Sequence, residues 1–480
     1  MLYLAASARA DSQNRLVEFS EDSFLRQKRT HHEDHHLHRV RGLFVDRFTL
    51  KSTMTTGARG PNYCRAKRNP CSGHGIVLDA SEQAVNEILM KAKNEEIDKG
   101  NFLPSQNFLR VHDSVDNSTV FRMIRDMPKG AALHVHDTAI VSLDYVYHNL
   151  TYRPNLYVSQ RGDSLRLRFF DKPKDDSWTL LSDARNETLD ARIKRQLSLE
   201  VDADPDVVYP NGNAVWKKFI SIFVFGRDLI CLQVGKLSLL SPTMFEDYTY
   251  QGLLEFYQDN VLYYGPMEVA RIYQRVAERF ERDHPDFVGL KLIYAPSFVV
   301  GFDLVSQEDI GLPLVEVADQ LLDLNDELPF FFHAGETNWY GSSSDENLLD
   351  AVLLNTRRIG HGYALVKHPE LLEMVRRRNI AIELCPVSNQ VLALVRDQRN
   401  HPATTIPASG LLADSVTIFT RAFLGIMSRR ADLKVFKKLV YNSIQYSAMS
   451  KEDKWKALDI WLNKWQAFIN KYFGTSFIEK

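Results

Sequence analysis

The fold of this 480-residue chain is decided by residues 328–337, which read LPFFFHAGET. The apolar run from Phe330 to Phe332 is too short for a typical helix and indicates a buried strand. The run ends in an imidazole, His333, followed by two small residues and a carboxylate, Glu336. Strands that end in titratable side chains build the active sites of (β/α) barrels. Taken alone, the stretch fits a core strand with an incidental histidine equally well, so its function depends on partners elsewhere in the chain.

The segments that follow alternate between helical and strand-like patterns. We expect helices at 346–354, 369–378 and 387–395, and strands at 358–363 and 380–385. This strand–helix alternation predicts a parallel (β/α) barrel. His361 stands between two glycines at the end of the first of these strands, where the backbone can approach a ligand closely. By itself, it also fits a histidine in a glycine-rich turn.

Two further histidines lie in residues 127–137, which read MPKGAALHVHD. Leu133 and Val135 alternate with these histidines, as residues of a strand do. The alternation puts His134 and His136 on the same face, where both can bind one metal ion. A His-x-His pair is a weak signal for a metal when it is taken alone.

Residues 431–473 are also expected to be largely helical, and the other periodic segments precede residue 305. Helices are expected at 80–98, 213–225, 248–264 and 269–283. Two strand-like runs, 288–295 and 298–304, follow with almost no chain between them. Consecutive parallel strands need a crossover of about a dozen residues or more, usually a helix. The two runs are therefore either one bent strand or the place where a connecting helix has been lost.

The composition restricts the class of protein and its partners. Charged residues make up 25% of the chain and hydrophobic residues 44%, which is typical of a globular protein. The net charge of −2 gives no reason to expect nucleic acid or an acidic membrane as a partner. No apolar run approaches transmembrane length. The four cysteines form no CxxC pair, which argues against a zinc knuckle, and we expect Cys385 to be a buried thiol.

Residues 1–75 differ from the rest of the chain. They are basic, lack a periodic apolar pattern and contain a His-rich tract, so we expect disorder rather than a functional metal site. Residues 1–10 are mildly apolar but too short for a signal peptide. Sequons at Asn117, Asn149 and Asn186 are relevant only if the chain is secreted.

The titratable residues of these motifs form one constellation. They end three predicted strands, and barrel strands end on a common face: His134, His136, His333, Glu336 and His361. Three histidines with one open position make a catalytic zinc site, in which bound water has a pKa of about 7. Glu336 is expected to act as an acid or base rather than as a ligand, because it lies three residues past His333. His361 is expected to position or deprotonate the attacking water, so the pattern favours a mononuclear zinc hydrolase.

Four motifs resemble those of the adenosine deaminase family: MPKGxxLHxHD at 127–137, HAGET at 333–337, RIGHG at 358–362 and CPxSNQ at 385–390. The likeness is greatest to the secreted branch, the adenosine deaminase-related growth factors of the adenosine deaminase 2 type. The resemblance implies a TIM-type α/β barrel and the hydrolysis of adenosine, or 2′-deoxyadenosine, to inosine and ammonia. It also implies a homodimer and an extracellular location, although the N-terminus shows no clear signal peptide.

With this resemblance, the chain divides into three parts. Residues 1–75 are the disordered segment, 76–126 a helical region used in dimerisation, and 127–480 the metal-dependent deaminase barrel. An insertion is expected around residues 152–212. Its first half is polar and irregular, and indicates an inserted loop or a small subdomain.

The resemblance also assigns roles, position by position. His134, His136 and His333 match the histidines that bind one zinc ion. Glu336 matches the residue that protonates N1 of the purine, and His361 matches the histidine beside the attacking hydroxide.

Three further positions match residues that bind the substrate. Asp137 matches an acidic residue at the ribose end, and Trp216 lies where this branch has a tryptophan in the substrate pocket. The backbone of Gly335 is expected to lie close to the purine. The His-x-Glu and Pro-Cys-x-x-Cys signature of the cytidine-type zinc deaminases is absent.

The chain departs from the family pattern at its late strand. The family has Ser-Ser-Asp-Asp-Pro there, whose first aspartate completes the zinc site and whose second contacts the hydroxide or the purine. Here residues 407–416 read PASGLLADSV, and Asp414 is the only nearby carboxylate. Further departures lie at 224–240, after Tyr264 and between the runs 288–295 and 298–304. We therefore expect an incomplete barrel that results from a defective gene model or a splice form.

These departures leave two main hypotheses. The chain is either a zinc adenosine deaminase or a catalytically impaired, growth-factor-like or nucleoside-binding relative that keeps the fold. The intact His/Glu set favours the first hypothesis, and the missing Asp-Asp pair favours the second. A barrel hydrolase of another substrate is a third, less specific interpretation.

Overall fold

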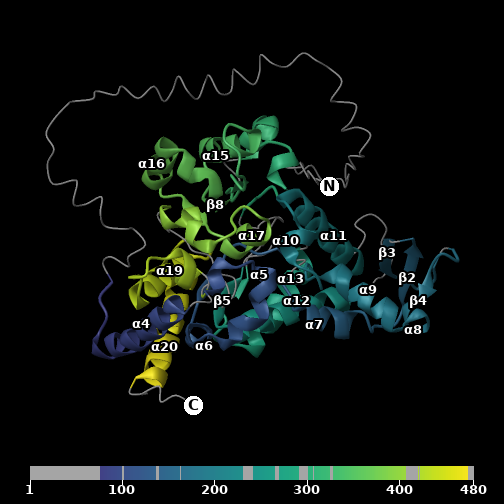
Figure 1. Ribbon diagram of the computed structural model, residues 1–480, viewed down its shortest axis with the longest axis horizontal. Coiled ribbons are helices and arrows are strands. Elements are labelled where there is room, and N and C mark those ends of the chain that lie inside the picture. The colour runs from purple at the N-terminus through teal and green to yellow at the C-terminus, as the bar shows by residue number, and fades with distance from the viewer. Residues whose placement is uncertain are drawn as a thin grey trace, which may run out of the picture.

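The computed structural model of the chain (Figure 1) describes residues 76–99, 102–136, 140–162, 164–173, 175–230, 242–264, 270–290, 301–305, 307–324, 328–406, 420 and 422–473. The predictions made for residues 1–75 and for the late stretch 407–416 lie outside these described residues.

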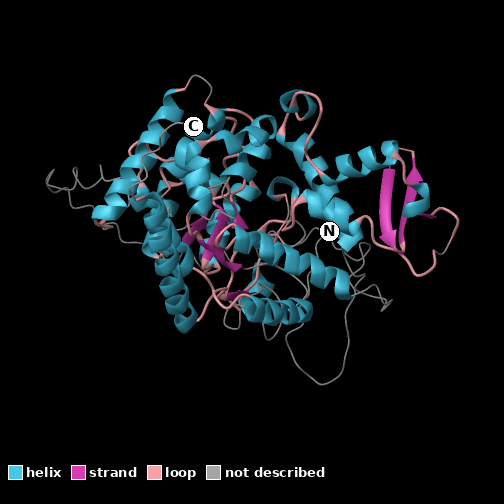
Figure 2. Ribbon diagram, turned by 90° about the horizontal axis from the view of Figure 1, so that it is seen from below, coloured by secondary structure: helices cyan, strands magenta, loops and turns pink. Residues whose placement is uncertain are grey.

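Short parallel strands form the centre of the molecule, and helices lie around them (Figure 2). One sheet has the order β1-β5-β6 and another the order β7-β8-β9, and every pairing in both is parallel. The strands are β1 (Gly130–Ala132), β5 (Val261–Tyr264), β6 (Gly289–Leu290), β7 (His333–Ala334), β8 (Arg358–His361) and β9 (Ala381–Glu383). This arrangement confirms the predicted α/β class.

The phenylalanine run before β7 is buried, as its sequence predicts, but it has strand pairing only at Phe330, and β7 itself begins at His333. Phe302 pairs with Phe330 in a parallel bridge, in which Phe302 N donates to Pro329 O at 2.8 Å and Phe331 N donates to Phe302 O at 2.9 Å. Phe330 and Phe332 have no exposed surface. The apolar side chains therefore fix the run in the core, and its polar end emerges as β7.

Side chains connect the two parallel sheets, from the start of β8 and from the end of β9 to the chain that follows β1. Arg358, on β8, donates through Nη2 to Leu133 O at 3.4 Å, and Glu383, on β9, contacts the ring of His134. The chain after β1 therefore lies against β8 and β9. A closed ring of paired strands is not formed by the residues that the structure describes.

The prediction of one helix over 248–264 is wrong at its C-terminal end. Helix α12 (Pro242–Gln258) ends there, Asn260 has a φ of 61°, and the next four residues form β5. Asparagine tolerates this left-handed conformation, which turns the chain out of the helix. The β-branched and aromatic side chains that follow suit a strand. The helix predicted over 387–395 is also too long, since α17 (Pro386–Val391) ends before Ala393, which has a φ of 62°.

Most of the other predicted helices lie where their apolar periodicity places them. Helix α4 (Ala80–Asp98) begins at a capping box in which the Asp79 side chain accepts from Glu82 N and the Glu82 side chain accepts from Asp79 N. The other predicted helices are α11 (Gly212–Ile230), α13 (Ala270–Asp283), α15 (Ser343–Leu353), α16 (Pro369–Arg377), α19 (Leu433–Gln445) and α20 (Lys451–Tyr472). The remaining α-helices described are α5 (Phe108–Val111), α6 (Thr119–Asp126), α7 (Leu143–Tyr145), α8 (Leu181–Ala184), α9 (Glu187–Leu197), α10 (Pro205–Val208) and α14 (Ala318–Leu324).

The N-terminal helical region packs against the C-terminal helices, and α4 lies beside α20 in Figure 1. Glu82 accepts hydrogen bonds from Lys437 Nζ at 2.5 Å and from Trp465 Nε1 at 2.6 Å. Trp461 Nε1 donates to Pro128 O at 3.0 Å, directly before β1. The two ends of the described chain thus support the first strand of the parallel sheets.

The polar segment after Tyr152 forms a small antiparallel sheet. Its strands are β2 (Leu156–Arg161), β3 (Ser164–Phe169) and β4 (Thr179–Leu180), in the order β3-β2-β4. Figure 2 shows this sheet apart from the central strands. Leu165 and Leu167 are buried while Arg166 is exposed, so the segment alternates as a half-buried strand does. Of the two interpretations left open by the sequence, the structure favours a small subdomain.

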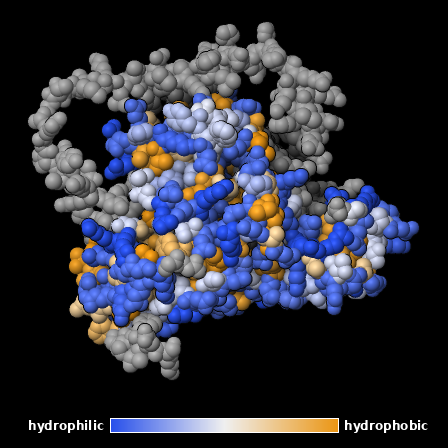
Figure 3. Space-filling model, viewed as in Figure 1, coloured by the Kyte–Doolittle hydropathy of each residue, from blue (hydrophilic) through white to orange (hydrophobic). Residues whose placement is uncertain are grey.

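Polar side chains cover most of the face shown in Figure 3, and apolar side chains appear there in small groups. Among the described helices, none combines the length and the hydropathy that a membrane span requires. Cys385 is a buried thiol, as predicted, and its Sγ donates to Glu383 O at 3.7 Å.

A buried lysine lies between the N-terminal and C-terminal helices. Lys93 Nζ donates to Ser428 O and Ala431 O, both at 3.0 Å, and lies 3.7 Å from the centroid of the Phe423 ring. Burial lowers the pKa of Lys93 to about 7, although Asp432 acts in the opposite direction. An unfolded chain keeps a lysine pKa near 10.5. Between these two values the unfolded state binds more protons than the folded state, so the stability of the fold rises with pH.

We therefore expect the Tm of the native protein to rise relative to that of Lys93→Met between about pH 6 and about pH 9, because methionine cannot titrate. Within this window the slope reaches about 1.4 kcal/mol per pH unit. Thermal unfolding of both proteins across this range measures the effect. Lys91→Met, which removes an exposed lysine of the same helix, is the control and should show a Tm difference that does not change with pH. A pH-independent Tm difference for Lys93→Met would contradict the prediction.

Candidate active site

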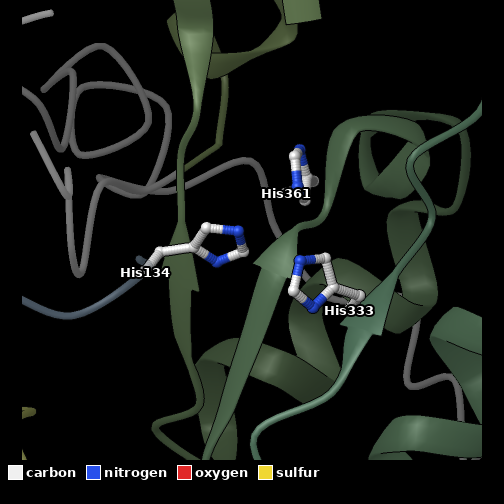
Figure 4. A group of neighbouring side chains, drawn as sticks. All are labelled: His134, His333 and His361. Carbon is white, nitrogen blue, oxygen red and sulfur yellow. The ribbon is translucent and has the colours of Figure 1, made fainter. Parts of the chain in front are cut away.

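Three chain segments bring three buried histidines together (Figure 4). His134 follows β1, His333 begins β7 and His361 ends β8. In the parallel ladder His333 pairs with Gly360 and Ala334 pairs with His361, which aligns the ends of these two strands. One ring nitrogen of each histidine lies within 4.8 Å of the others.

His136 joins this group, but not through the predicted strand. Strand β1 ends at Ala132, and residues 133–136 have no strand structure, so the alternation expected for His134 and His136 is wrong. The His136 ring nevertheless lies 5.3 Å from that of His134 and 5.4 Å from that of His333, centroid to centroid. All four histidine rings are therefore neighbours.

Carboxylates hold two of these rings by their Nδ1 atoms. His333 Nδ1 lies 2.6 Å from Asp303 Oδ2, and His134 Nδ1 lies 2.8 Å from Glu383 Oε2. Burial would lower the pKa of His333, but Asp303 overrides this effect and raises it to about 9. A carboxylate on Nδ1 leaves Nε2 as the metal-binding atom, which is the usual support of a zinc-bound histidine.

An unsatisfied atom tests whether these residues fit a metal ion. His333 Nε2 is buried and has no hydrogen-bond partner among the described residues. A buried nitrogen without a partner is costly unless something absent from the protein chain binds it. Imidazole nitrogens are the ligands that zinc prefers together with thiolates. His333 therefore fits a metal ligand, and it lies in the group of three histidines, with His134 and His361, whose ring nitrogens are close enough to hold one ion.

A buried ion pair fixes the carboxylate behind His134. Arg358 donates through Nε to Glu383 Oε1, and Nη1 of the same arginine donates to Tyr446 O at 3.0 Å. Burial opposes ionisation, but Arg358 and His134 hold the pKa of Glu383 at about 2. A Cβ atom at Gly360 would lie 2.9 Å from the His134 ring, so only glycine lets this ring lie against β8.

Glu336 is a buried carboxyl group beside His361. Its Oε1 lies 3.0 Å from His361 Nδ1, and its backbone N–H donates to Glu308. Burial raises the pKa of Glu336 to about 8, although His333 acts in the opposite direction. A carboxyl group of this kind holds its proton near neutral pH and can serve as a general acid.

His361 lies in a strained conformation and in a chain of hydrogen bonds. Its φ of 62° is rare for a residue other than glycine, and such strain is concentrated at functional sites. Its Nδ1 lies 3.1 Å from Asn389 Nδ2, and Asn389 Oδ1 lies 3.0 Å from His401 Nε2. Burial lowers the pKa of His361 well below its usual value, so the ring is neutral.

The three predicted substrate-binding residues have different outcomes. Asp137 lies outside the described residues. Trp216 is half-buried on α11 and contacts Phe219, with 5.4 Å between ring centroids, and the described contacts of the histidines do not include it. Gly335 is buried with a φ of 72°, where a Cβ atom would lie 2.6 Å from Leu348. The late carboxylate Asp414 is not among the described residues.

Sequence reasoning missed the residues that hold the histidines and Glu336: Asp303, Glu308, Arg358, Glu383, Asn389 and His401. A charge inside an apolar run, such as Glu383 within 380–385, is a usable signal because a buried charge needs a partner. Nothing in the spacing of the sequence indicates which histidine each carboxylate holds.

Comparison with known proteins gives consistent matches. A family model described as adenosine deaminase matches residues 269–459, and one described as adenosine/AMP deaminase N-terminal matches residues 62–124. Adenosine deaminase 2 of Homo sapiens is 36% identical, with 83% of this chain and 90% of the human protein covered. An adenosine deaminase of Aedes albopictus is 38% identical, with 82% of this chain and 84% of the mosquito protein covered. A zinc-bound amidohydrolase structure from Burkholderia ambifaria shares 16% identity with a TM-score of 0.49, over 74% of this chain and 94% of that one.

Replacing Asp303 with asparagine is expected to weaken metal binding by about 10- to 100-fold, because the uncharged amide orients the His333 ring less firmly and makes Nε2 less basic. Competition with a chelator, followed by metal analysis of the protein, measures this change. Asp319→Asn, which alters an exposed carboxylate on α14, is the control. Unchanged metal affinity in Asp303→Asn would show that this carboxylate does not support a metal ligand.

Proposed function

The chain belongs to the adenosine deaminase family, as an enzyme of the adenosine deaminase 2 branch, and on this premise we propose that it hydrolyses adenosine or 2′-deoxyadenosine to inosine and ammonia with one zinc ion per subunit. The observation that carries the proposal is the pairing of two carboxylate-held histidines with a buried Glu336 in the same site. The first feature fits a metal ligand set and the second fits a proton donor.

His134, His136 and His333 would hold the zinc ion. When bound, zinc lowers the pKa of a water molecule to about 7 and so supplies a nucleophile at neutral pH. Asp303 and Glu383 orient two of the three rings and keep their Nε2 atoms available.

Glu336 would give a proton to the substrate, and His361 would hold the attacking water. The oxygen of water adds at C6 of the purine while N1 receives a proton from Glu336, which one proton of the water replaces. The other proton of the water leaves with the C6 amino group as ammonia, and C6 keeps the oxygen. Glu336 holds a proton near neutral pH because it is buried, and it donates this proton to N1. His361 holds the attacking water in place. The burial of both side chains keeps bulk water away from these transfers.

Asp137, Trp216 and Gly335 would bind the substrate, at the ribose end, in the pocket and beside the purine respectively. We also infer an incomplete TIM-type barrel over residues 127–480, with the antiparallel subdomain inserted around 152–212 and the helical region 76–126 used in a homodimer. The curated relatives of the adenosine deaminase 2 type support an extracellular location.

A catalytically impaired relative is the second candidate, and two observations favour it. The alignment with the human protein extends over 472 positions but uses only 83% of this 480-residue chain, so it contains positions for which the chain has no residue. The Asp-Asp pair that the family carries at its late strand is also absent from the sequence. The intact ligand and acid residues favour the active enzyme.

Purified protein supplied with zinc is expected to convert adenosine to inosine, which the change in ultraviolet absorbance follows directly. Glu336→Gln should reduce kcat by about 10²- to 10⁴-fold, because the amide has no acidic proton to donate. Glu370→Gln, which alters an exposed residue on α16, should leave kcat unchanged. Absence of turnover in the native protein with stoichiometric zinc would favour the impaired relative, and turnover without metal would exclude the zinc mechanism.

A further inference from the structure

We propose that Asn389 and His401 are positioning residues that decide which ring nitrogen of His361 carries the hydrogen. They place it on Nε2, so that His361 donates a hydrogen bond to the reacting centre and does not bind the metal. The proposal deepens the deaminase function proposed above and rests on it for the role of His361 in the reaction. The argument from hydrogen bonds does not depend on turnover.

The first step of the argument is the hydrogen bond to His401. Ala403 N lies 3.1 Å from His401 Nδ1. A backbone N–H can only donate, so His401 Nδ1 accepts and carries no hydrogen. A neutral imidazole then carries its hydrogen on Nε2. Burial lowers the pKa of His401 to about 3, which agrees with a neutral ring.

The second step fixes the amide of Asn389. His401 Nε2–H faces Asn389 Oδ1 at 3.0 Å and donates to it. The oxygen and nitrogen of an asparagine amide can normally be exchanged, but here an amide NH₂ group would face another donor. The Asn389 side chain has no exposed surface, so water does not offer an alternative partner. The orientation with Oδ1 toward His401 is therefore the one that the hydrogen bonds allow.

The third step uses the orientation of the Asn389 amide to decide which ring nitrogen of His361 carries the hydrogen. Asn389 Nδ2 lies 3.1 Å from His361 Nδ1. An amide nitrogen only donates, so His361 Nδ1 accepts and the hydrogen of this ring lies on Nε2. Glu336 Oε1 also lies 3.0 Å from Nδ1, but without the geometry of a hydrogen bond, so among the described residues the hydrogen-bond partner of this Nδ1 atom is Asn389.

These hydrogen bonds give His361 a different role from that of His134 and His333. The Nδ1 atoms of His134 and His333 face carboxylates, which accept hydrogen and leave a lone pair on Nε2 for a metal. The hydrogen-bond partner of His361 Nδ1 is a donor, the amide nitrogen of Asn389, so Nε2 of this ring has a hydrogen and no lone pair to give. Distance alone groups these three rings, but their hydrogen-bond partners assign two of them as ligands and the third as a donor.

The substitution Asn389→Asp tests the proposal, because it keeps the size of the side chain and replaces the NH₂ donor with a carboxylate acceptor. We expect the hydrogen of His361 to move from Nε2 to Nδ1. Nitrogen NMR of metal-free protein labelled with ¹⁵N-histidine reads this directly, and loss of a signal in His361→Gln assigns it. In the deaminase assay kcat should fall by about 10²-fold or more with little change in KM, since a lost hydrogen-bond donor affects the reaction more than substrate binding.

Asn86→Asp is the matched control. Asn86 is also buried, its Oδ1 accepts from Leu433 N at 2.9 Å, and it lies on α4, outside the catalytic machinery. This variant should leave both the His361 signal and kcat unchanged, which separates the effect from that of placing any carboxylate in the core.

A native spectrum with the His361 hydrogen on Nδ1 would overturn the proposal, and so would an Asn389→Asp variant with native tautomer and native kcat. The native spectrum decides the matter even if the variant does not fold. A native protein without turnover but with the hydrogen on Nε2 would refute the deaminase function and leave the positioning of His361 intact.

Discussion

The contact between Asp303 and His333 is the constraint on which the rest of the site depends. One carboxylate holds two atoms of the histidine, since Oδ1 accepts from the backbone N at 2.8 Å and Oδ2 lies 2.6 Å from Nδ1 of the ring. The residues are 30 positions apart, on chain segments joined by the bridge between Phe302 and Phe330. The phenylalanine core thus sets the register, and the register sets the direction of the ring. A shift of one residue would point His333 to the opposite face of the sheet.

Each of the buried charges around this contact has a fixed partner. Glu383 is shared between Arg358 and His134, and Glu308 accepts from the backbone of Glu336 and from Asn347 Nδ2 at 3.0 Å. Burying charged groups costs desolvation free energy. Their partners offset this cost, but the site does not thereby add net stability to the fold. The benefit is that the polar side chains are already oriented before a ligand binds, as catalysis by preorganised groups requires.

The sequence predicts the parts of the molecule that depend on local patterns. Helix α4 has its predicted bounds because the apolar period and the capping box agree, and the histidine motifs meet in one site. The strand β5 was not predicted, because its apolar residues continue the pattern of α12 and the turn depends on the φ of Asn260. Asp303 and Glu383 were not predicted as supports, because such partnerships cross between strands and depend on the register. Long-range pairing of this kind leaves no periodic trace in the chain.

The absence of the late aspartate removes less from the metal site than the family pattern implies. A catalytic zinc site needs three protein ligands and one open position, and a fourth protein ligand is not essential. The described carboxylates nearest the histidines cannot easily take its place, because both oxygens of Asp303 and both of Glu383 already have partners. If His361 is a donor rather than a ligand, the third ligand has to be His136. The chemistry then depends on the irregular chain after β1, which holds His136 near His134 and His333 without the support of a strand.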